Sequence, residues 1–413
     1  MTKTDSEREG AKPEVRGGLG LWLIGARGAI ATCVTYGVAG LARGWVEPTG
    51  LVTSIEPLRR LDMAGFDEFV LGGWDVCKRD LSKSVSNLVR EGILSQDLVA
   101  SASVEATSYE SRIRPGILDG PAVGTPDLDP ESSRRGALSA RDQIDELRAD
   151  LTAFREEHDL RQVIVVDLTS TEAFRAGLMG AAEVANLAAM EKALDDGFSF
   201  PASVIYAYAA IGAGSPFVEF TPNTGSSPPA LRELALELGV PHCGNDGKTG
   251  ETLFKTALAP MFAARALNVL SWQGYNMLGN GDGAVLADPA HREGKLRNKD
   301  EVLKGILGEH HSHVAIDYVP SLGDWKTAWD FVHFEGFLGA KMSMQITWAG
   351  CDSALAAPLI IDLARLADFS AKVGEGGEMA HTACFFKSPL TGGTHDFHAQ
   401  HRTLVAYCEK HLG

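Results

Sequence analysis

A short strand, a glycine-rich turn and a helix near the start of the chain constrain its fold more than any other feature. Residues 19–24 (LGLWLI) form an apolar run of the length expected for a buried strand. They lead into GARGAIA, residues 25–31, and then into a predicted helix that ends near Arg43. Backbone N–H groups at such a turn can bind a pyrophosphate, as in dinucleotide-binding domains. The turn departs from GxGxxG because Arg27 takes the place of the second glycine and the third glycine is also missing, so by itself it fits a plain strand-to-helix turn as well.

The segments that follow this turn predict strands that alternate with helices. Apolar runs at residues 69–71, 163–166 and 204–208 predict short strands, whereas residues 140–158 and 181–195 predict helices. Because such alternation is typical of a parallel, doubly wound sheet, we expect an α/β fold.

The second half of the chain has a different character. Residues 331–348 contain two strand-like runs whose faces are rich in Phe, Met and Trp. Faces of this kind are usually covered by helices of the same chain or by another subunit. Residues 353–366 then predict an apolar helix that returns the chain to the core.

Composition and charge exclude several classes of partner. A chain of 413 residues exceeds a typical single domain, which favours two domains. Its 38 basic and 54 acidic residues give a net charge of −16, which argues against nucleic acid or an anionic membrane. No apolar run approaches the ~20 residues that a membrane span needs. Six scattered cysteines favour reduced cytoplasmic thiols, and residues 1–18 read as a disordered leader.

Five lysines lie in glycine-rich or turn-like settings: Lys248, Lys295, Lys299, Lys326 and Lys387. Any one of them could simply extend to solvent from an apolar segment. Lys295 and Lys299 are four residues apart, and like charges at that spacing repel unless an anion lies between them. Together the five fit an anionic substrate such as a sugar phosphate, whose oxyanions need cationic stabilisation.

Carboxylates accompany these lysines, at Asp246, Asp282, Asp324 and Asp352. No His or Cys residues have the spacing of zinc ligands, so a zinc site is not expected. His310, His311 and His313 are predicted to lie at the surface, at a charged helix end. No GxSxG nucleophile motif is present.

At these positions the sequence resembles the myo-inositol-1-phosphate synthase family, from about residue 19 to residue 390. Several family motifs occur in the family's order with nearly its spacing. They are GGWD (72–75), GNDGKTGET (244–252), GYNMLGNGDG (274–283), YVPSLGDWK (318–326), CDSALAAPLIIDL (351–363) and KSPL (387–390). The glycine and asparagine loop within 274–283 could have been a solvent loop, but the resemblance implies that it binds the substrate.

The resemblance implies an NAD-binding, Rossmann-like domain that is interrupted by an α+β catalytic and oligomerisation domain. The implied boundaries are residues 19–252 and 352–413 for the first domain and residues 253–351 for the second. It also implies a homotetramer in which the strands of residues 331–348 bury their apolar face between subunits.

The implied reaction is the redox-neutral cyclisation of glucose 6-phosphate to 1L-myo-inositol 1-phosphate with NAD. Oxidation at C5 acidifies C6, the enolate attacks the C1 aldehyde, and C5 is then reduced again. The resemblance assigns Lys295 to the C5 hydroxyl and Lys387 to the aldehyde oxygen. It assigns Lys299 and Lys326 to phosphate or oxyanion, with Asp246 orienting a lysine.

The remaining positions that match the family motifs are expected to bind substrate or NAD. The expected substrate-binding residues are Lys248, Thr249, Gly250, Asn276, Leu278, Asn280 and Asp282. The expected cofactor-binding residues are Gly25, Ala26, Arg27, Gly28, Ala29, Ile30, Asp75, Thr169, Ser170, Asp324 and Asp352. Arg27 is expected to contact the pyrophosphate, since its charge-assisted hydrogen bond could substitute for the backbone N–H bonds that a second glycine would allow.

The chain departs from the family mainly where NAD is expected. GGNNG is replaced by ARGAIA, LWTANTERY by DLTSTEAF (residues 167–174), and GSPQNTFVPG by GSPFVEFTPN (residues 214–223). Three alternatives therefore stay open: a related cyclase that closes fructose 6-phosphate to a five-membered ring, a simple NAD-dependent dehydrogenase, and a non-catalytic sugar-phosphate sensor. A requirement for a monovalent or divalent cation also stays open.

Overall fold

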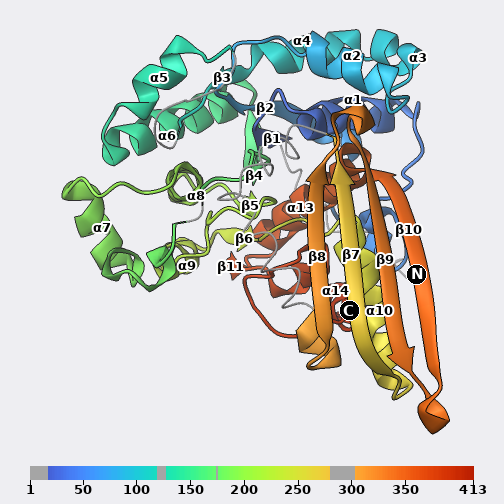
Figure 1. Ribbon diagram of the computed structural model, residues 1–413. Coiled ribbons are helices and arrows are strands. Elements are labelled where there is room, and N and C mark those ends of the chain that lie inside the picture. The colour runs from blue at the N-terminus through green and yellow to red at the C-terminus, as the bar shows by residue number, and fades with distance from the viewer. Residues whose placement is uncertain (1–16, 119–126, 174, 280–302) are drawn as a thin grey trace, which may run out of the picture.

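The computed structural model describes residues 17–118, 127–173, 175–279 and 303–413, and it contains two β-sheets (Figure 1). The first has seven parallel strands in the order β11-β6-β5-β4-β1-β2-β3. The second has four strands in the order β10-β9-β7-β8. The predicted α/β class with a doubly wound sheet is confirmed.

The seven-stranded sheet begins in its centre and grows in both directions. Its strands are β1 Gly18–Ile24, β2 Phe69–Asp75, β3 Ile113–Pro115, β4 Leu160–Asp167, β5 Phe217–Glu219, β6 Pro241–Cys243 and β11 Gly377–Glu378. β1 pairs with β2 on one side and with β4 on the other. The strand order therefore reverses beside β1, which is where ligands bind in open parallel sheets.

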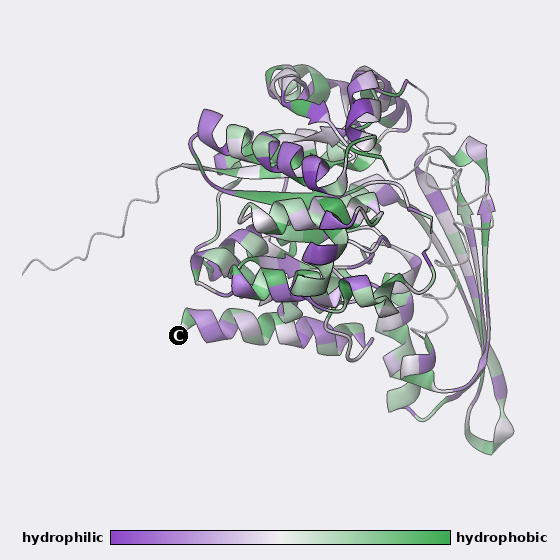
Figure 2. Cartoon of the chain, turned by 90° about the vertical axis from the view of Figure 1, so that its left-hand side faces the viewer, coloured by the Kyte–Doolittle hydropathy of each residue, from purple (hydrophilic) through white to green (hydrophobic). Residues whose placement is uncertain are grey.

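Helices cover both faces of this sheet, so its strands are apolar on both sides (Figure 2). Leu21 and Leu23 face one core, and Trp22 and Ile24 face the other. The first core is covered by α1 Ala29–Arg43, α13 Asp352–Lys372 and α14 Phe397–Leu412. The second is covered by α6 Ala140–Glu157, α7 Leu187–Asp195, α8 Ala202–Gly212 and α9 Pro229–Glu237.

Shorter helices fill the connections between the strands. They are α2 Ser82–Arg90, α3 Gln96–Ser101 and α4 Ser103–Ser111 between β2 and β3, α5 Pro130–Gly136 before α6, and α10 Glu251–Ala264 before β7. Single-turn helices are η1 Val52–Ser54, η2 Leu58–Arg60, η3 Phe66–Glu68, η4 Leu178–Gly180, η5 Ala182–Val184, η6 Pro320–Leu322, η7 Phe337–Gly339 and η8 Ala380–Phe385. No described helix is long and apolar enough to cross a membrane.

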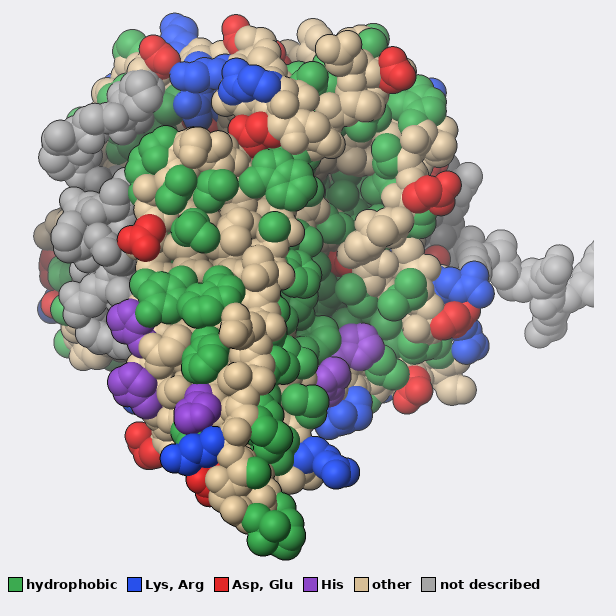
Figure 3. Space-filling view, turned by 45° about the vertical axis from the view of Figure 1, so that its right-hand side comes forward, with side chains coloured by type: hydrophobic (Ala, Val, Ile, Leu, Met, Phe, Trp, Pro, Cys, Tyr) green, Lys and Arg blue, Asp and Glu red, His purple; other side chains and the backbone are tan. Residues whose placement is uncertain are grey.

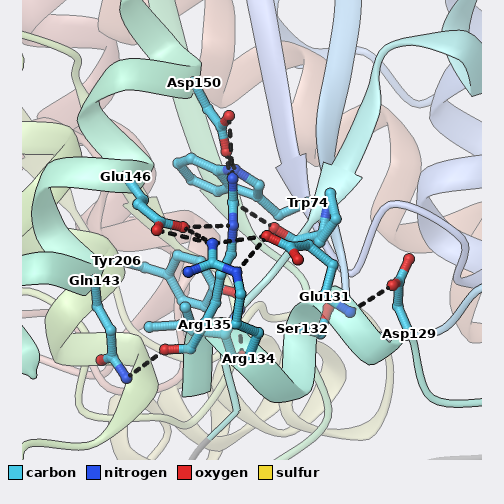
Figure 4. Close-up of polar contacts among 12 residues, drawn as sticks. Trp74, Asp129, Glu131, Ser132, Arg134, Arg135, Gln143, Glu146, Asp150 and Tyr206 are labelled. Carbon is cyan, nitrogen blue, oxygen red and sulfur yellow. Dashed lines mark hydrogen bonds and ion pairs between the residues drawn. The ribbon is translucent and has the colours of Figure 1, made fainter. Parts of the chain in front are cut away.

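A buried arginine ties α5 to the edge of the sheet (Figure 4). Arg135 Nη1 lies 2.6 Å from Asp150 Oδ2 of α6 and donates to the Pro115 carbonyl at the end of β3. Asp150 Oδ2 also accepts from the indole of Trp74 in β2. One carboxylate therefore holds α5, α6 and β2 together.

The four-stranded sheet packs one face on α10 and leaves the other open. Its strands are β7 Asn268–Leu278, β8 His311–Tyr318, β9 Trp325–Glu335 and β10 Lys341–Cys351. β7 is parallel to β8 and antiparallel to β9. Phe262 of α10 packs against Trp272 and Phe334, with ring centroids 6.1 and 5.1 Å apart.

The opposite face of this sheet, which we call the open face, faces the viewer in Figure 1. It carries aromatic side chains. Tyr275, Trp329, Phe331 and His333 form a row in which neighbouring ring centroids lie 5.7 to 6.4 Å apart. Figure 3 shows hydrophobic and histidine side chains at the surface of this part of the molecule. In Figure 2, none of the described helices lies over this face.

The sequence predicted one apolar face for residues 331–348, and this is wrong. Strand alternation places Phe331 on the open face, whereas Phe334 and Met344 pack into the core with α10. Trp348 lies against Phe254 of α10, at 6.2 Å between ring centroids. Met342 and Ile346 lie on the same face of β10 as Met344 and Trp348. Phe337 is 89% exposed at the tip of the β9–β10 hairpin.

Three further local predictions are corrected. Residues 204–208 lie within α8, not in a strand. The helix expected from residue 181 begins at Leu187, after η5. His311 and His313 belong to β8, not to a helix end.

Candidate active site

A cleft of about 420 Å³ lies between the two sheets, at the carboxyl ends of the central parallel strands. It brings together predicted residues from segments that are far apart in the sequence. These are Gly25, Gly28, Ala29, Ile30, Thr169, Ser170, Asp246, Thr249, Leu278, Asp324, Lys326, Asp352 and Lys387.

The loop after β1 forms one wall of the cleft. Gly25 has a φ of +83°, and a Cβ there would lie 3.0 Å from the Leu168 carbonyl oxygen, so this position requires glycine. The N–H groups of Gly25 and Ala26 donate to the Trp74 carbonyl. Helix α1 then begins after Gly28 without a side-chain cap or an acidic residue in its first turn. Its free N–H groups therefore suit an anion.

Arg27 supports this loop from behind. Its Nη1 lies 3.1 Å from Glu110 Oε1 of α4, and its backbone N–H donates to Asp75 Oδ2. Asp75 is buried, and its other carboxylate oxygen accepts from the Cys77 N–H. Ala26, Arg27 and Asp75 do not line the cleft, and the pyrophosphate contact of Arg27 stays a prediction.

Two lysine–aspartate pairs line the cleft. Lys387 Nζ lies 2.7 Å from Asp246 Oδ1, and the Lys387 N–H donates to the Asp246 carbonyl. Lys326 Nζ lies 3.7 Å from Asp352 Oδ2, whose other oxygen accepts from Thr249. All four charged side chains are largely shielded, with exposures between 6% and 23%. The cleft thus supplies cations that fixed carboxylates hold in place.

Asp324 joins the second sheet to the first residues of α13. Its Oδ2 accepts from the Cys351 thiol at 2.9 Å and from the Ser353 N–H at 3.2 Å. Burial raises the pKa of Asp324 above its usual value. The carboxyl group therefore fixes the floor of the cleft between Lys326 and α13.

A buried carboxyl pair lies beneath the loops that line the cleft. Asp167 and Glu219 are register partners at the ends of β4 and β5, and neither is exposed to solvent. Asp167 accepts from the Thr169 N–H, and Glu219 accepts from the Thr221 N–H. Burial, reinforced by the Asp167 carboxylate, raises the pKa of Glu219 well above its usual value. The two buried carboxyl groups therefore hold both loops through these hydrogen bonds.

Lys248, expected to bind substrate, lies outside the cleft. Its Nζ donates to Gln400 Oε1 at 2.7 Å and lies 5.8 Å from the ring centre of Phe397, both on α14. Burial, and to a lesser extent the Lys387 charge, lowers the pKa of Lys248 to about 8. Direct substrate contact by this ammonium group is therefore not supported, and Lys248 instead attaches the site to the C-terminal helix.

A second buried charge cluster lies between α10 and the four-stranded sheet. Lys255 Nζ lies 2.6 Å from Glu251 Oε1 and 3.2 Å from Asp330 Oδ1, and Trp272 donates to Asp330. Burial alone would lower the pKa of Lys255, but the two carboxylates raise it. A Cβ on Gly274 would lie 2.6 Å from this ammonium nitrogen. The cluster therefore fixes the start of α10, directly after Thr249 and Gly250.

The sequence of the chain matches the family model described as "Myo-inositol-1-phosphate synthase" over residues 19–408. The chain belongs to this family. It is 30% identical over 411 residues to inositol-3-phosphate synthase 1 of Bacteroides thetaiotaomicron, covering 93% of this chain and 91% of that protein.

Other members of the synthase family agree with this assignment. Inositol-3-phosphate synthase isozyme 1 of Arabidopsis thaliana is 30% identical over 369 residues, covering 85% of this chain and 66% of the plant protein. The crystal structure of inositol-3-phosphate synthase from Caenorhabditis elegans superposes with a TM-score of 0.80 at 22% identity. The superposition covers 95% of this chain and 85% of that one, and it confirms the fold.

Several residues that the sequence predicted for the site of this synthase-family chain cannot be located in the cleft. Lys295, Lys299, Asn280 and Asp282 lie outside the described residues. Asn276 is described and 1% exposed, and neither polar atom of its side chain has a hydrogen-bond partner there.

The sequence analysis missed several polar residues at or near the site. Arg79, Lys83, Ser84 and Asn87 from the segment that includes α2 line the cleft. Gln400 and the Lys255 cluster were not predicted either. Contacts between segments that are distant in the sequence bring these residues together. None of them stands in a motif or charge pattern that would have predicted the site from the sequence.

Proposed function

We propose that the chain is an NAD-dependent synthase that cyclises glucose 6-phosphate to 1L-myo-inositol 1-phosphate without net redox change. The observation that carries the proposal is the single cleft into which the glycine loop and the two lysine–aspartate pairs open. Its similarity to the inositol-3-phosphate synthases over most of the chain supports the same reaction.

The glycine loop and the start of α1 fit the dinucleotide. NAD supplies a hydride acceptor at C5 and returns the hydride after ring closure. The orphan N–H groups at the start of α1 would bind its pyrophosphate, and Thr169 and Ser170 at the end of β4 would line its path. We assign Asp324 and Asp352 to the nicotinamide end, because both lie where β9, β10 and α13 meet.

The two lysine–aspartate pairs would act on the sugar phosphate. The Lys387 ammonium group would neutralise the C1 oxygen as it becomes an alkoxide during the aldol step. Asp246 holds that ammonium in position. Lys326, held by Asp352, would bind phosphate or the enolate oxygen. Lys295 and Lys299 keep their proposed roles at the C5 hydroxyl and the phosphate.

A substrate comparison tests the proposal. The purified protein, supplied with NAD, is given 13C-labelled glucose 6-phosphate or fructose 6-phosphate, and the product is identified by 13C and 31P NMR. We expect an inositol phosphate from glucose 6-phosphate and no accumulation of NADH at 340 nm. A carbocycle formed from fructose 6-phosphate alone would favour the related cyclase. Stoichiometric NADH would identify a dehydrogenase instead.

We also propose a homotetramer and the domain boundaries implied by the resemblance. The uncovered aromatic row on the open face supports contact with another subunit. The strands of the second sheet all lie between Asn268 and Cys351, inside the proposed catalytic domain of residues 253–351. The scattered thiols support a reducing cytoplasmic location.

A further inference from the structure

The segment that leads into α2 borders the glycine loop. Ser84 Oγ donates to the Arg27 carbonyl at 2.8 Å, which joins the first turn of α2 to the loop. The Leu81 N–H donates to Glu110 Oε1 at 3.0 Å, and the same oxygen pairs with the Arg27 guanidinium. Glu110 and Ser84 therefore fix the start of α2 beside the expected pyrophosphate position.

Two basic side chains of this segment line the cleft without a carboxylate partner. Arg79 precedes α2 and Lys83 lies in its first turn, on the same cleft wall as Gly25 and Gly28. Within the described parts of the chain, neither side chain forms an ion pair. The Arg79 Nε is buried and has no hydrogen-bond partner among those residues. Because an unsatisfied buried donor is costly, a bound anion would stabilise this arrangement.

The position of the pair in the fold indicates which anion it would bind. In dinucleotide-binding domains the residues at and after the end of the second strand face the adenosine ribose. Here that strand ends at Asp75, and Arg79 follows four positions later. We propose that Arg79 and Lys83 bind a phosphate group of the adenosine half of the dinucleotide. This inference rests on the proposed function, and it assigns to Arg79 and Lys83 the role that the sequence had suggested for Arg27.

Two phosphates of a dinucleotide could occupy this position. The pyrophosphate is present in NAD and NADP, whereas the 2′-phosphate is present only in NADP. Arginine and lysine bind either group by charge-assisted hydrogen bonds. Arg79 and Lys83 line the cleft together with Gly25 and Gly28, and Ser84 joins α2 to the glycine loop, so we expect the pair to bind the pyrophosphate.

Isothermal titration of the full chain with NAD and with NADP tests this inference. The variants are Arg79→Ala, Lys83→Ala and the double substitution, and Lys78→Ala serves as the matched control. Lys78 is an exposed basic residue of the same segment that does not line the cleft. Circular dichroism and thermal unfolding check that each variant is folded, and Arg79→Lys provides a conservative substitution.

We expect each alanine variant to bind NAD at least about tenfold more weakly, with a shallower salt dependence, while Lys78→Ala binds normally. Equal reductions in affinity for NAD and NADP would identify the pyrophosphate as the bound group, and a reduction confined to NADP would identify the 2′-phosphate. Affinities of folded Arg79→Ala and Lys83→Ala that match Lys78→Ala for both dinucleotides would overturn the inference. Failure of the wild-type chain to bind either dinucleotide would instead contradict the proposed function.

Discussion

Lys387 approaches the Asp246 carboxylate to 2.7 Å, and its side chain is only 14% exposed. Replacing it with alanine should lower turnover by about 10²–10³-fold or more, since it removes the cation proposed to stabilise the C1 alkoxide. NAD affinity should change little, because the glycine loop and α1 are untouched. Steady-state kinetics and NAD titration measure the two effects. Near-normal turnover in Lys387→Ala would show that this lysine only extends to solvent.

Lys248 gives a pH-dependent prediction for stability. Its pKa falls from 10.5 to about 8 on folding, so between these values the unfolded chain binds more protons than the folded chain. The cost of burying the ammonium is therefore fully present below pH 8, and its contribution to the unfolding free energy rises from pH 8 to pH 10.5. Urea unfolding of wild type and Lys248→Met across this range isolates the effect. Parallel curves for the two proteins would contradict it.

These two lysines also show how far the residues of the site could be predicted. Lys387 and Asp246 stand in family motifs, and the structure brings them together in the cleft. Lys248 stands in an equally good motif, but its environment is set by Gln400, 152 positions along the chain. Sequence spacing carries no information about that contact, because only packing of α14 creates it.

At the scale of elements, the buried cluster on α10 should matter for stability. Lys255→Met would leave Glu251 and Asp330 as buried carboxylates without their cation, which should lower the free energy of unfolding by about 3–5 kcal/mol. Lys341→Met, an exposed position on β10, is the matched control. Chemical denaturation measures both variants. A Lys255→Met protein as stable as the control would show that the cluster is neutral to the fold.

Helices and strands were predictable from the sequence where apolar residues lay on one face of a helix or formed one short run of a strand. The β1–α1 opening, β2, β4, α6 and α13 were expected from the sequence and are present. Helix α8 was mistaken for a strand because Ala202–Ile211 is buried on every side, so its sequence has no polar face to reveal a helical period. The prediction for residues 331–348 was wrong for another reason: β9 carries large apolar residues on both faces, one toward α10 and one outward, whereas those of β10 lie on the face toward α10.

At the scale of the whole molecule, the open face should mediate assembly. Trp329→Glu would place a charge in the aromatic row, where burial between subunits contributes about 25 cal/mol per Å², and should split the oligomer. Val104→Glu, which charges a 72% exposed apolar residue on α4, is the control and should leave the mass unchanged. Light scattering decides the matter. A wild-type mass near 44.1 kDa would show a monomer and contradict the prediction.

The parallel sheet is completed by segments that lie on both sides of the second sheet in the chain. Leu21 and Leu23 of β1 share one core with Ile360 and Leu363 of α13. On the ribosome, about 350 residues separate β1 from the end of α13, which corresponds to about 20–70 s of synthesis at about 5–20 residues per second. During that time one face of the nascent sheet is uncovered. Because the parallel sheet is interrupted in this way, we expect the nascent chain to bind chaperones that shield apolar surface during translation.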